Sequence, residues 1–346
     1  MRLQPGAHPP FLNDLPVDVV RRRLMQAAAS GLVATATPWT QAQTQTQGAT
    51  ADLSKVSLRV AAYKGGWTTL LKAAGLAGTP YRIDWKEFNS GVQHIEGINA
   101  CALDLGSGSE IPAVFAARSP GRVRVVAVSK GDLNNQAVFA QKDAPIRSIA
   151  DLKGKRVGYV RATTTHYFLH KMLAEVGLSL QDVQLASLSP ADGLSAFARG
   201  DIDAWAIYGY NGQIARTKYG ARPIKTSLGY LSGNFLVYGN AEALADAPRQ
   251  AALADLLVRV QKATAWAVAN PEKWAEAQSA ETRVPVDALL ALFRARSHDD
   301  RIKAIDPADI ASHQDVADVF ARISVLDAPV KVAPLWDHSF DKALRA

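Results

Sequence analysis

The amino-acid sequence predicts an α/β fold built on largely parallel sheets, and three observations support this prediction. From residue 55 onward, short apolar runs of strand length alternate with stretches whose apolar residues recur at helical spacing. Glycine, serine and threonine follow several of these runs, as is typical where a strand turns into a helix. Beyond residue 240 the pattern is helical only, which predicts a carboxy-terminal helical layer.

Composition limits the size, the class and the partners of the protein. The chain has 346 residues with 48% hydrophobic content, which is enough for a large core in two lobes. With 21% charged residues, it lacks the composition of a disordered protein. A single cysteine, Cys101, excludes an internal disulfide and a multi-cysteine metal site. The net charge of +7 suits an anionic ligand, but the basic residues are dispersed, so we expect no nucleic-acid partner.

Residues 1–42 have the layout of a signal peptide, with a polar leader, an arginine run, a short apolar stretch and a small-residue region. The pair Arg21 and Arg22 resembles the twin-arginine pattern, and the apolar stretch of residues 24–36 is too short to span a bilayer. We expect cleavage near Ala42, a flexible leader over residues 43–54 and export to the periplasm. Cleavage lowers the net charge to about +5. The alternative is a disordered basic leader without a role in export.

Eight apolar runs are predicted as strands because each is short and lies between turn-forming residues. In chain order these runs are residues 57–62, 103–105, 123–128, 137–140, 156–160, 183–187, 204–208 and 235–238. No internal repeat is visible in the sequence.

The helices are predicted from their caps and their apolar faces. Ser189 before Pro190 is a helix N-cap, and Gly200 ends the same helix before the next strand. Residues 165–176 place apolar side chains on one face at helical spacing, which predicts a core helix. Four further helices are expected at residues 248–270, 271–280, 285–295 and 308–323.

Three predicted strand-to-helix turns are candidate anion-binding positions. Helix starts expose unpaired N–H groups and the positive end of the helix dipole, and ligands of open α/β sheets bind at the carboxyl ends of the strands. If two lobes face each other, the turns can converge on one ligand. The residues are Tyr63, Lys64, Gly65 and Gly66 in the first turn, Ser107, Gly108, Ser109 and Glu110 in the second, and Arg161, Thr163, Thr164, Thr165 and His166 in the third.

Each candidate also has a simpler structural interpretation. Serine, threonine and glycine at a helix start are ordinary capping residues, and a lone histidine such as His166 is often structural or solvent-facing. Cys101 precedes a predicted strand, where a buried and inert thiol is expected. The sequence has no GxSxG elbow, Walker loop, GxGxxG or HExxH motif, so we expect no catalytic site, no cofactor and no metal.

Five segments carry a resemblance to a known family: LRVAAYKGG, DLGSGSEIPAVFAA, APIRSIADLKGKRVGYV, LSPADGLSAFARGDIDAWAIY and GNFLVYGN. Over residues 57–340 the chain resembles the solute-binding proteins of ABC transporters, in the aliphatic sulfonate branch of the nitrate, sulfonate and taurine group. The resemblance implies a type II periplasmic binding protein fold with two lobes, each a mixed sheet flanked by helices. It implies a first lobe of residues 55–140 and 233–346 and a second lobe of residues 141–232.

The resemblance also implies roles for the candidate residues. Residues 107–110 would form one wall of the pocket and residues 163–165 the other, with the turn at residues 63–65 completing the first-lobe side. Trp205 and Tyr208 would line the tail of the ligand, although Trp205 lies inside a predicted strand and equally fits the core. The chain departs from the family at residues 208–211, which read Tyr-Gly-Tyr-Asn where a Trp-Asp-Pro-like turn is common. It also has an extra glycine in the first turn.

The function implied by the resemblance is capture of an aliphatic sulfonate, or a similar small organic anion, by a monomer that delivers it to an ABC permease in the inner membrane. Taurine, nitrate, bicarbonate and aromatic sulfonates stay open as ligands. An enzyme is a further alternative, because a sulfinate desulfinase and thiamin-precursor synthases share the fold. Cys101 would then be the nucleophile with His94 or His166 as base, yet Cys101 precedes its strand and so lies away from the ligand-facing strand ends.

Overall fold

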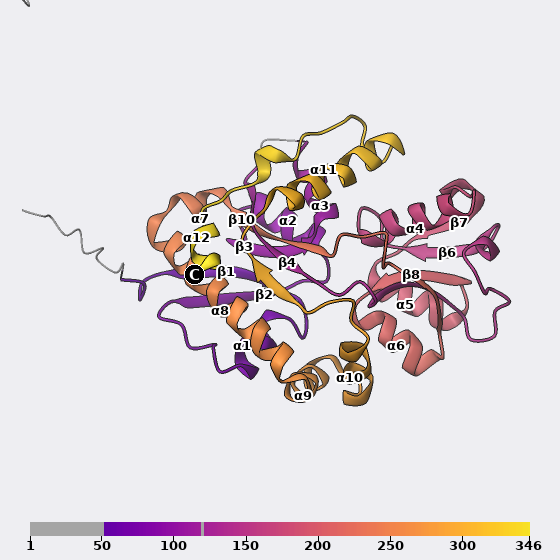
Figure 1. Ribbon diagram of the computed structural model, residues 1–346, viewed down its shortest axis with the longest axis horizontal. Coiled ribbons are helices and arrows are strands. Elements are labelled where there is room, and N and C mark those ends of the chain that lie inside the picture. The colour runs from indigo at the N-terminus through magenta and orange to yellow at the C-terminus, as the bar shows by residue number, and fades with distance from the viewer. Residues whose placement is uncertain (1–51, 119–120) are drawn as a thin grey trace, which may run out of the picture. The chain divides into compact units, whose positions relative to one another are not determined.

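Two mixed β-sheets organise the part of the chain that the structure describes. The computed structural model describes residues 52–118 and 121–346. The expected signal peptide and most of the expected leader lie outside these residues. Both sheets belong to one unit of the chain, Thr50–Ala346, in which helices cover each sheet to give two lobes (Figure 1).

The first sheet is built from strands at both ends of the described chain. Its strands are β1 Ser57–Ala62, β2 Arg82–Glu87, β3 Leu105–Ser109, β4 Val123–Lys130, β10 Asn234–Asn240 and β11 Arg301–Lys303. They lie in the order β11-β4-β10-β3-β1-β2. β1 is parallel to β2 and β3, whereas β10 is antiparallel to β3 and β4. Val123, Val125 and Val128 of β4 are fully buried, because helices cover both faces of the sheet.

The second sheet is built from one continuous stretch of the chain. Its strands are β5 Gln136–Ala140, β6 Arg156–Tyr159, β7 Gln184–Ser187, β8 Ala204–Tyr208 and β9 Arg222–Thr226. They lie in the order β7-β6-β8-β5-β9, with β6 parallel to β7 and β8, and β5 antiparallel to β8 and β9.

The chain crosses between the two sheets through residues 131–135 and again through residues 227–233. The Gly131 N–H donates to the Gly233 carbonyl at 2.9 Å, so the two crossings lie side by side. Gly233 has a φ of +77°, a left-handed conformation that favours glycine. These paired crossings are the positions at which a change of a few backbone angles would rotate one lobe against the other.

The helices divide unequally between the two lobes. Those in the chain segments of the first sheet are α1 Trp67–Ala73, α2 Gly91–Asn99, α3 Glu110–Ala116, α7 Ala241–Ala245, α8 Ala247–Ala269, α9 Pro271–Thr282, α10 Val286–Arg294, α11 Pro307–Arg322 and α12 Asp341–Arg345. Those of the second sheet are α4 Thr164–Glu175, α5 Pro190–Arg199 and α6 Tyr210–Tyr219. Among the described residues, no helix combines the length and the apolar composition that are needed to cross a membrane.

Several predicted elements are confirmed. β1 and β8 have the predicted bounds, and α4 and α8 to α11 lie within a few residues of their predictions. Ser189 caps α5 by accepting a hydrogen bond from Asp192 N, and Gly200 ends the helix with a φ of +78°. Leu253 and Val260 of α8 are fully buried, so this helix packs against the rest of the first lobe.

Other predictions were wrong for identifiable reasons. The strand expected at residues 103–105 is β3, Leu105–Ser109, so the glycine-rich segment belongs to the strand and not to a turn. Glycine is rare in strands, but here the backbones pack closely: a Cβ on Gly108 would lie 2.9 Å from the Gly91 Cα. β2, β9 and β11 were missed because β2 and β9 are polar and β11 has three residues, so the pattern beyond residue 240 is not helical only.

The expected lobe boundary at residue 140 also needs correction. β5, Gln136–Ala140, pairs with β8 and β9 and therefore belongs to the second sheet. The first crossing ends just before Gln136, so the boundary lies a strand earlier than expected. An apolar run is compatible with either sheet, and only its pairing partners decide the assignment.

Candidate ligand-binding site

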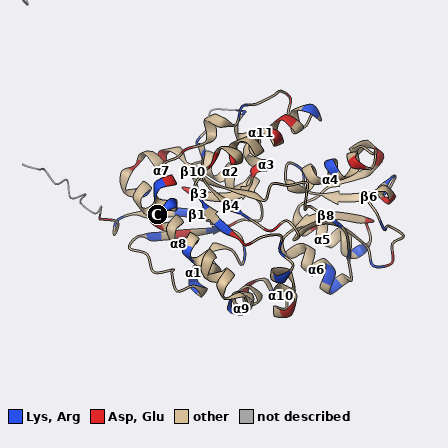
Figure 2. Cartoon of the chain, in the orientation of Figure 1, with Lys and Arg blue, Asp and Glu red and all other residues tan. Residues whose placement is uncertain are grey.

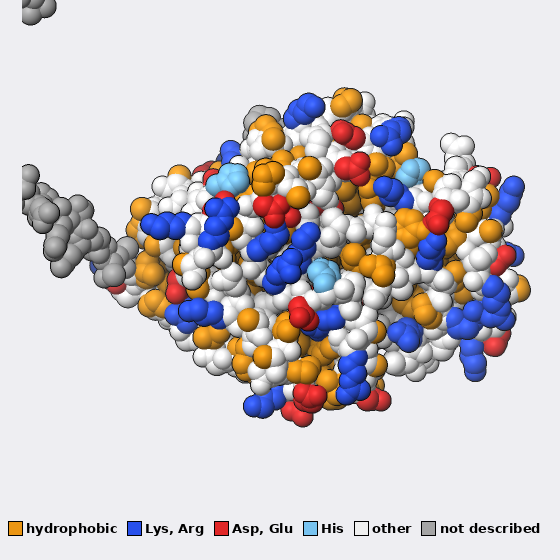
Figure 3. Space-filling model, viewed as in Figure 1, with side chains coloured by type: hydrophobic (Ala, Val, Ile, Leu, Met, Phe, Trp, Pro, Cys, Tyr) orange, Lys and Arg blue, Asp and Glu red, His pale blue; other side chains and the backbone are white. Residues whose placement is uncertain are grey.

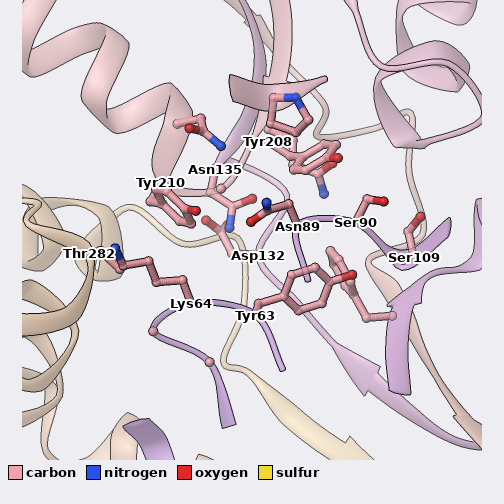
Figure 4. Close-up of a pocket in the computed structure, with 18 of the residues that line it drawn as sticks. Tyr63, Lys64, Asn89, Ser90, Ser109, Asp132, Asn135, Tyr208, Tyr210 and Thr282 are labelled. Carbon is pink, nitrogen blue, oxygen red and sulfur yellow. The ribbon is translucent and has the colours of Figure 1, made fainter. Parts of the chain in front are cut away.

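A cavity of about 750 Å³ is lined by residues of both lobes (Figure 4). This volume lies in the range of pockets that enclose small organic ligands. The first lobe contributes the turn after β1 and the segment before α2, and the second lobe contributes the starts of α4, α5 and α6. The cavity therefore lies where the carboxyl ends of strands from both sheets meet.

Six helices begin at the cavity wall. Each of them contributes its N-cap or its first residue to the lining, namely Gly66 of α1, Ser90 of α2, Ser109 of α3, Thr164 of α4, Ser189 of α5 and Gly209 of α6. Each helix start directs unpaired N–H groups and a partial positive charge outward, worth about 0.3–1 kcal/mol to a nearby anion. Together these starts make the cavity suitable for a negatively charged group from two sides.

The capping serines differ in what they leave for a ligand. Ser90 Oγ accepts a hydrogen bond from Gln93 N at 3.4 Å, so this hydroxyl caps its own helix. Ser109 precedes α3, and its side chain forms no capping hydrogen bond. It lines the cavity, as residues of the second lobe such as Tyr208 do (Figure 4). The Ser109 hydroxyl is therefore the better placed of the two to bind a ligand oxygen.

Gln136 offers an amide donor at the same wall. Thr164 Oγ1 donates to Gln136 Oε1 at 2.6 Å, and both residues line the cavity. Gln136 is 1% exposed, and its Nε2 has no partner among the described residues. Because a buried donor without a partner is costly, a ligand oxygen at this position would be stabilised.

Two tyrosines approach each other from the two lobes. The Tyr63 hydroxyl donates to the Ser107 carbonyl at 3.0 Å, and Tyr208 ends β8 at the opposite wall. Burial raises the pKa of Tyr63 above its usual range, and the nearby Tyr208 raises it further. Burial also raises the pKa of Tyr208. Both phenols therefore stay protonated and can donate hydrogen bonds.

Four charged side chains line the cavity: Lys64, Arg296, Asp132 and Asp300. Lys64 forms no ion pair within the described part of the chain. Arg296 lies 3.7 Å from Asp300 and stacks over the Phe293 ring at 4.8 Å. On the face of the protein shown in Figures 2 and 3, basic and acidic residues are mixed over both lobes. Within the described chain, no group of three or more His, Cys, Asp or Glu side chains is arranged to hold a metal ion.

The structure brings about half of the predicted site residues to the cavity. Those that line it are Tyr63, Lys64, Gly65, Gly66, Ser109, Thr164 and Tyr208. Those outside the lining are Ser107, Gly108, Glu110, Arg161, Thr163, Thr165, His166 and Trp205. That the lining residues bind a ligand stays a prediction.

In the second turn, only Ser109 faces the cavity. Ser107 and Gly108 lie inside β3, where side chains alternate between the two faces and the backbone packs against neighbouring elements. Glu110 is 3% exposed and accepts hydrogen bonds from Ser232 Oγ at 2.6 Å and from Ser312 Oγ. Burial raises the pKa of Glu110 to about 7. Its carboxyl group stabilises the second crossing and does not line the cavity.

In the third turn, the neighbours of Thr164 stabilise the turn itself. Thr163 Oγ1 and Thr165 Oγ1 donate to the Val160 carbonyl at 2.7 Å and 3.0 Å. His166 is 4% exposed, and burial, together with the charge of Arg161, lowers its pKa to about 4, so its ring is neutral. These residues have the capping and structural roles that are the usual alternative to a binding role.

Trp205 is a core residue and not a pocket residue. Its side chain is fully buried, and its ring packs against Phe197 with centroids 5.9 Å apart. The alternation of side chains along β8 places Trp205 on the face covered by α5, while Tyr208 at the strand end reaches the cavity.

Sequence reasoning missed several lining segments. Asn89, Ser90 and Gly91 follow β2, and no turn was expected there because β2 itself was missed. The residues at the start of α5 were identified as a helix cap but not as part of the site. A further wall, with Trp274, Leu289, Leu292 and Phe293, comes from α9 and α10. Both helices were expected, but nothing in the sequence indicated that they face a cavity.

Comparison with known proteins identifies the family. The family model described as NMT1/THI5 like matches residues 84–274, which is more than half of the chain. The chain belongs to the NMT1/THI5-like family. The matched range contains the whole second sheet, with its helices, and much of the cavity wall.

This NMT1/THI5-like chain is similar to the "Putative aliphatic sulfonates-binding protein" of Escherichia coli (strain K12), with 33% identity over 179 residues. That alignment covers 51% of this chain and 56% of the relative, so the match spans about half the length of each. Its structure is similar to the alkanesulfonate-binding protein SsuA from Xanthomonas axonopodis pv. citri bound to MOPS, with a TM-score of 0.74 and 25% identity. That similarity covers 81% of this chain and 98% of the solved chain. The two-lobed periplasmic binding protein fold is thereby confirmed.

The same fold also occurs in an enzyme. The desulfurization enzyme DSZB matches 84% of the NMT1/THI5-like chain and 99% of its own chain, with a TM-score of 0.58 and 17% identity. This similarity concerns the fold alone. Cys101 of the present chain does not line the cavity, and its Sγ lies 3.7 Å from the Glu242 carboxylate, which does not line the cavity either.

Proposed function

We propose that this protein is the solute-binding component of an ABC importer and captures an aliphatic sulfonate, or a similar small organic anion, between its two lobes. The similarity to sulfonate-binding proteins supports the ligand class. One structural observation carries the proposal: six helices from both lobes begin at one cavity. Such an arrangement binds negative charge without requiring a dedicated ion pair.

In this function, the anionic head accepts hydrogen bonds from donors on both lobes. Ser109 donates from the first lobe and Gln136 Nε2 from the second, with Lys64 adding a full positive charge. A ligand that contacts both lobes binds the closed form more tightly than the open form, so it shifts the population toward closure. The permease in the inner membrane then recognises the closed monomer.

The proposal includes export to the periplasm through the twin-arginine segment at Arg21 and Arg22. Changing both arginines to lysine retains the charge but removes the guanidinium pair. Cell fractionation should then find the protein retained in the cytoplasm, whereas the unchanged chain is found in the periplasm. Equal export of both chains would contradict the twin-arginine assignment.

Binding rather than catalysis is favoured by the chemistry of the cavity wall. The described residues that line the cavity include neither cysteine nor histidine, so they do not supply the nucleophile and base considered above. Cys101→Ala should leave ligand binding as it is in the unchanged protein. Loss of sulfonate binding in this variant would revive the enzymatic alternative.

The first experiment is a thermal-shift titration of residues 43–346 with alkanesulfonates of increasing chain length, taurine, aromatic sulfonates, nitrate, sulfate and bicarbonate. A ligand at 100 times its Kd stabilises the folded protein by about 2.7 kcal/mol, which raises Tm measurably. We expect a selective rise with a sulfonate.

The double change Ser109→Ala and Thr164→Val should abolish this rise. Ser107→Ala is the matched control, because Ser107 is two residues away but its side chain does not line the cavity. A shift with nitrate or bicarbonate alone would overturn the sulfonate assignment. A shift with no tested anion would overturn the binding function itself.

A further inference from the structure

The two lobes also touch each other outside the cavity. Tyr167 of α4, in the second lobe, belongs to a buried apolar cluster with residues of α3 and α11 of the first lobe. Its ring lies 5.9 Å, centroid to centroid, from the ring of Phe320, which is fully buried. Its hydroxyl donates to Asp315 Oδ2 at 3.2 Å. None of these three residues lines the cavity, so the contact does not serve the ligand directly.

Tyr167 makes most of this contact for the second lobe. Among the described residues, the other buried members of the cluster all belong to the first lobe, namely Ile111, Val114, Val316, Ala317, Val319, Phe320, Leu326 and Val332. The ring of His166 lies 5.4 Å from that of Phe320 and adds to the contact. Lys171 Nζ donates to the Tyr167 hydroxyl at 3.3 Å, which leaves the hydroxyl proton for Asp315. A change of Tyr167 therefore acts on the contact between the lobes more than on the core of either lobe.

The paired crossings separate this contact from the cavity. Asp132 and Asn135 of the first crossing line the cavity, whereas none of residues 227–233 of the second crossing, all of which the structure describes, does so. Instead, Leu231 of the second crossing packs against the cluster around Tyr167. Figure 1 shows α4 and α11 along one edge of the molecule and α9 and α10, which contribute to the cavity wall, along the opposite edge.

Closure of the cavity works against this contact. When two bodies rotate about a hinge, groups on the side that narrows approach each other and groups on the opposite side separate. A rotation about the crossings that narrows the cavity therefore moves α4 away from α11. The hydrogen bond to Asp315 and the packing on Phe320 are lost in that rotation. A contact made in only one of two states stabilises that state, which here is the open one.

We propose that the contact of Tyr167 with Phe320 and Asp315 holds the unliganded protein in its open form and thereby sets its affinity for ligands. For the effect on affinity, this inference rests on the proposed function. A ligand that binds the closed form has an apparent Kd equal to its Kd for that form divided by the closed fraction of the free protein. Tyr167 lowers this fraction, so it determines affinity from outside the cavity.

The first test measures Kd by isothermal titration with butanesulfonate as the probe. Tyr167→Phe removes only the hydrogen bond to Asp315 and should lower Kd by about threefold, as expected for one hydrogen bond lost from the open form alone. Tyr167→Ala also removes the ring and should lower Kd by about tenfold. A gain of affinity is not expected from a merely structural role. Kd values equal to or above that of the unchanged protein would overturn the inference.

Tyr81 provides the matched control, because it makes the same kind of hydrogen bond within one lobe. Its hydroxyl donates to Asp255 Oδ2 at 2.8 Å, its side chain is buried, and both residues belong to the first lobe. Neither residue lines the cavity. Tyr81→Phe should leave Kd as it is in the unchanged protein. An equal gain of affinity in Tyr81→Phe and Tyr167→Phe would overturn the assignment to the contact between the lobes.

The second test measures the separation of the lobes without any ligand. Spin labels at Lys218→Cys in α6 and Lys273→Cys in α9, in a Cys101→Ser background, report this separation by electron-spin distance measurement. Both lysines are exposed, and neither lines the cavity. Tyr167→Ala should shift the distance distribution of the unliganded protein toward shorter distances, because α6 and α9 both contribute to the cavity wall. An unchanged distribution would overturn the inference.

The two tests separate this inference from the proposed function. If no sulfonate binds, the sulfonate assignment fails, and the distance measurement still decides whether the contact holds the lobes open. Sulfonate binding with the same Kd and the same distances in the Tyr167 variants retains the proposed function and overturns the inference. Shorter distances without a gain of affinity would overturn the proposed role in setting affinity.

Discussion

Thr164 and Gln136 are joined by a hydrogen bond of 2.6 Å from Thr164 Oγ1 to Gln136 Oε1. Thr164 begins α4 and Gln136 begins β5, so the bond ties a helix start to the strand that follows the first crossing. Because the bond occupies the amide oxygen, the Gln136 Nε2 group is the one left to bind a ligand. This buried pair orients a donor at the wall where an anion is expected.

Thr164→Val should weaken anion binding and lower stability. It removes the partner of the Gln136 amide oxygen, so the amide loses its fixed orientation and keeps a buried unpaired acceptor. We expect Kd to rise by about threefold to tenfold and the free energy of unfolding to fall by about 1–2 kcal/mol. Titration calorimetry and urea unfolding measure the two effects.

The matched control is Thr217→Val in α6. Thr217 Oγ1 donates to the Gln213 carbonyl at 2.9 Å within its own helix, and Thr217 does not line the cavity. This variant should bind as the unchanged protein does. Equal losses of affinity in both variants would show that the Thr164 effect is not specific to the site.

Lys64→Met should reduce both the affinity for anions and its dependence on salt. The Lys64 ammonium lines the cavity and forms no ion pair within residues 52–118 and 121–346, so its charge is available to a ligand. Removing it should raise Kd by about tenfold at low salt, with a smaller difference at high salt, where charge interactions are screened. Lys72→Met at the exposed end of α1 is the control and should leave Kd unchanged. A Kd that does not depend on Lys64 at any salt concentration would contradict the prediction.

Asp104→Ala should destabilise the first lobe without involving the cavity. Asp104 is fully buried and accepts hydrogen bonds from Arg59 N at 2.8 Å and Arg59 Nε at 3.1 Å. Removing the carboxylate leaves the Arg59 backbone N–H and two of the three guanidinium nitrogens without their partner, at a cost of about 2–3 kcal/mol, while the bond from the guanidinium to the Cys101 carbonyl remains. Asp84→Ala removes the exposed pair with Lys86 and should cost less than about 0.5 kcal/mol. Chemical unfolding of both variants tests the contrast, and similar costs would refute it.

His313→Leu should make the protein more resistant to acid. His313 of α11 is fully buried, and neither ring nitrogen has a hydrogen-bond partner among the described residues. Burial lowers its pKa from 6.5 to about 3. The unfolded chain therefore binds a proton first as pH falls, and the folded state loses stability from about pH 6.5 downward. At pH 4.5 the loss amounts to about 2–3 kcal/mol from this residue.

The measurement is urea unfolding of both proteins at pH 7 and pH 4.5. The stability of the leucine variant relative to the unchanged protein should increase as pH falls, because leucine cannot bind the proton. The unchanged protein and the variant share all other titrating groups, so the difference isolates His313. A constant difference between pH 7 and pH 4.5 would show that His313 does not contribute to acid sensitivity.

Sequence reasoning located the helix starts more accurately than the strands that precede them. Ser189 and Gly200 bound α5 as expected, because caps depend on one residue and its immediate neighbours. The glycine-rich segment of β3 was placed in a turn, because its strand conformation depends on pairing with β10, more than 120 residues away. Local chemistry is visible in a sequence, whereas pairing between distant segments is not.

The same distinction explains which site residues were predicted. Ser109 and Thr164 were found because hydroxyl residues at helix starts are recognisable. Trp205 was expected at the pocket but is buried in the core, because the adjacent residues do not show which face of a strand is covered. Glu110 was also expected there but is buried at the second crossing, because its partner Ser232 is distant in the sequence. Asp132 was missed because the crossing has no periodic pattern. Gln136 was missed because it begins the strand β5, and a strand pattern does not show which of its ends faces a cavity.

By itself the sequence determined the α/β class, the positions of most helices and a set of turns with the chemistry of anion binding. The tertiary structure decided which turns share one cavity, which side chains face it and which carboxylates accompany the cations there. The physical reason is that helix caps and apolar spacing act over a few residues. The order of strands in a sheet and the packing of two lobes join residues that are far apart in the chain, such as Asp132 and Ser297.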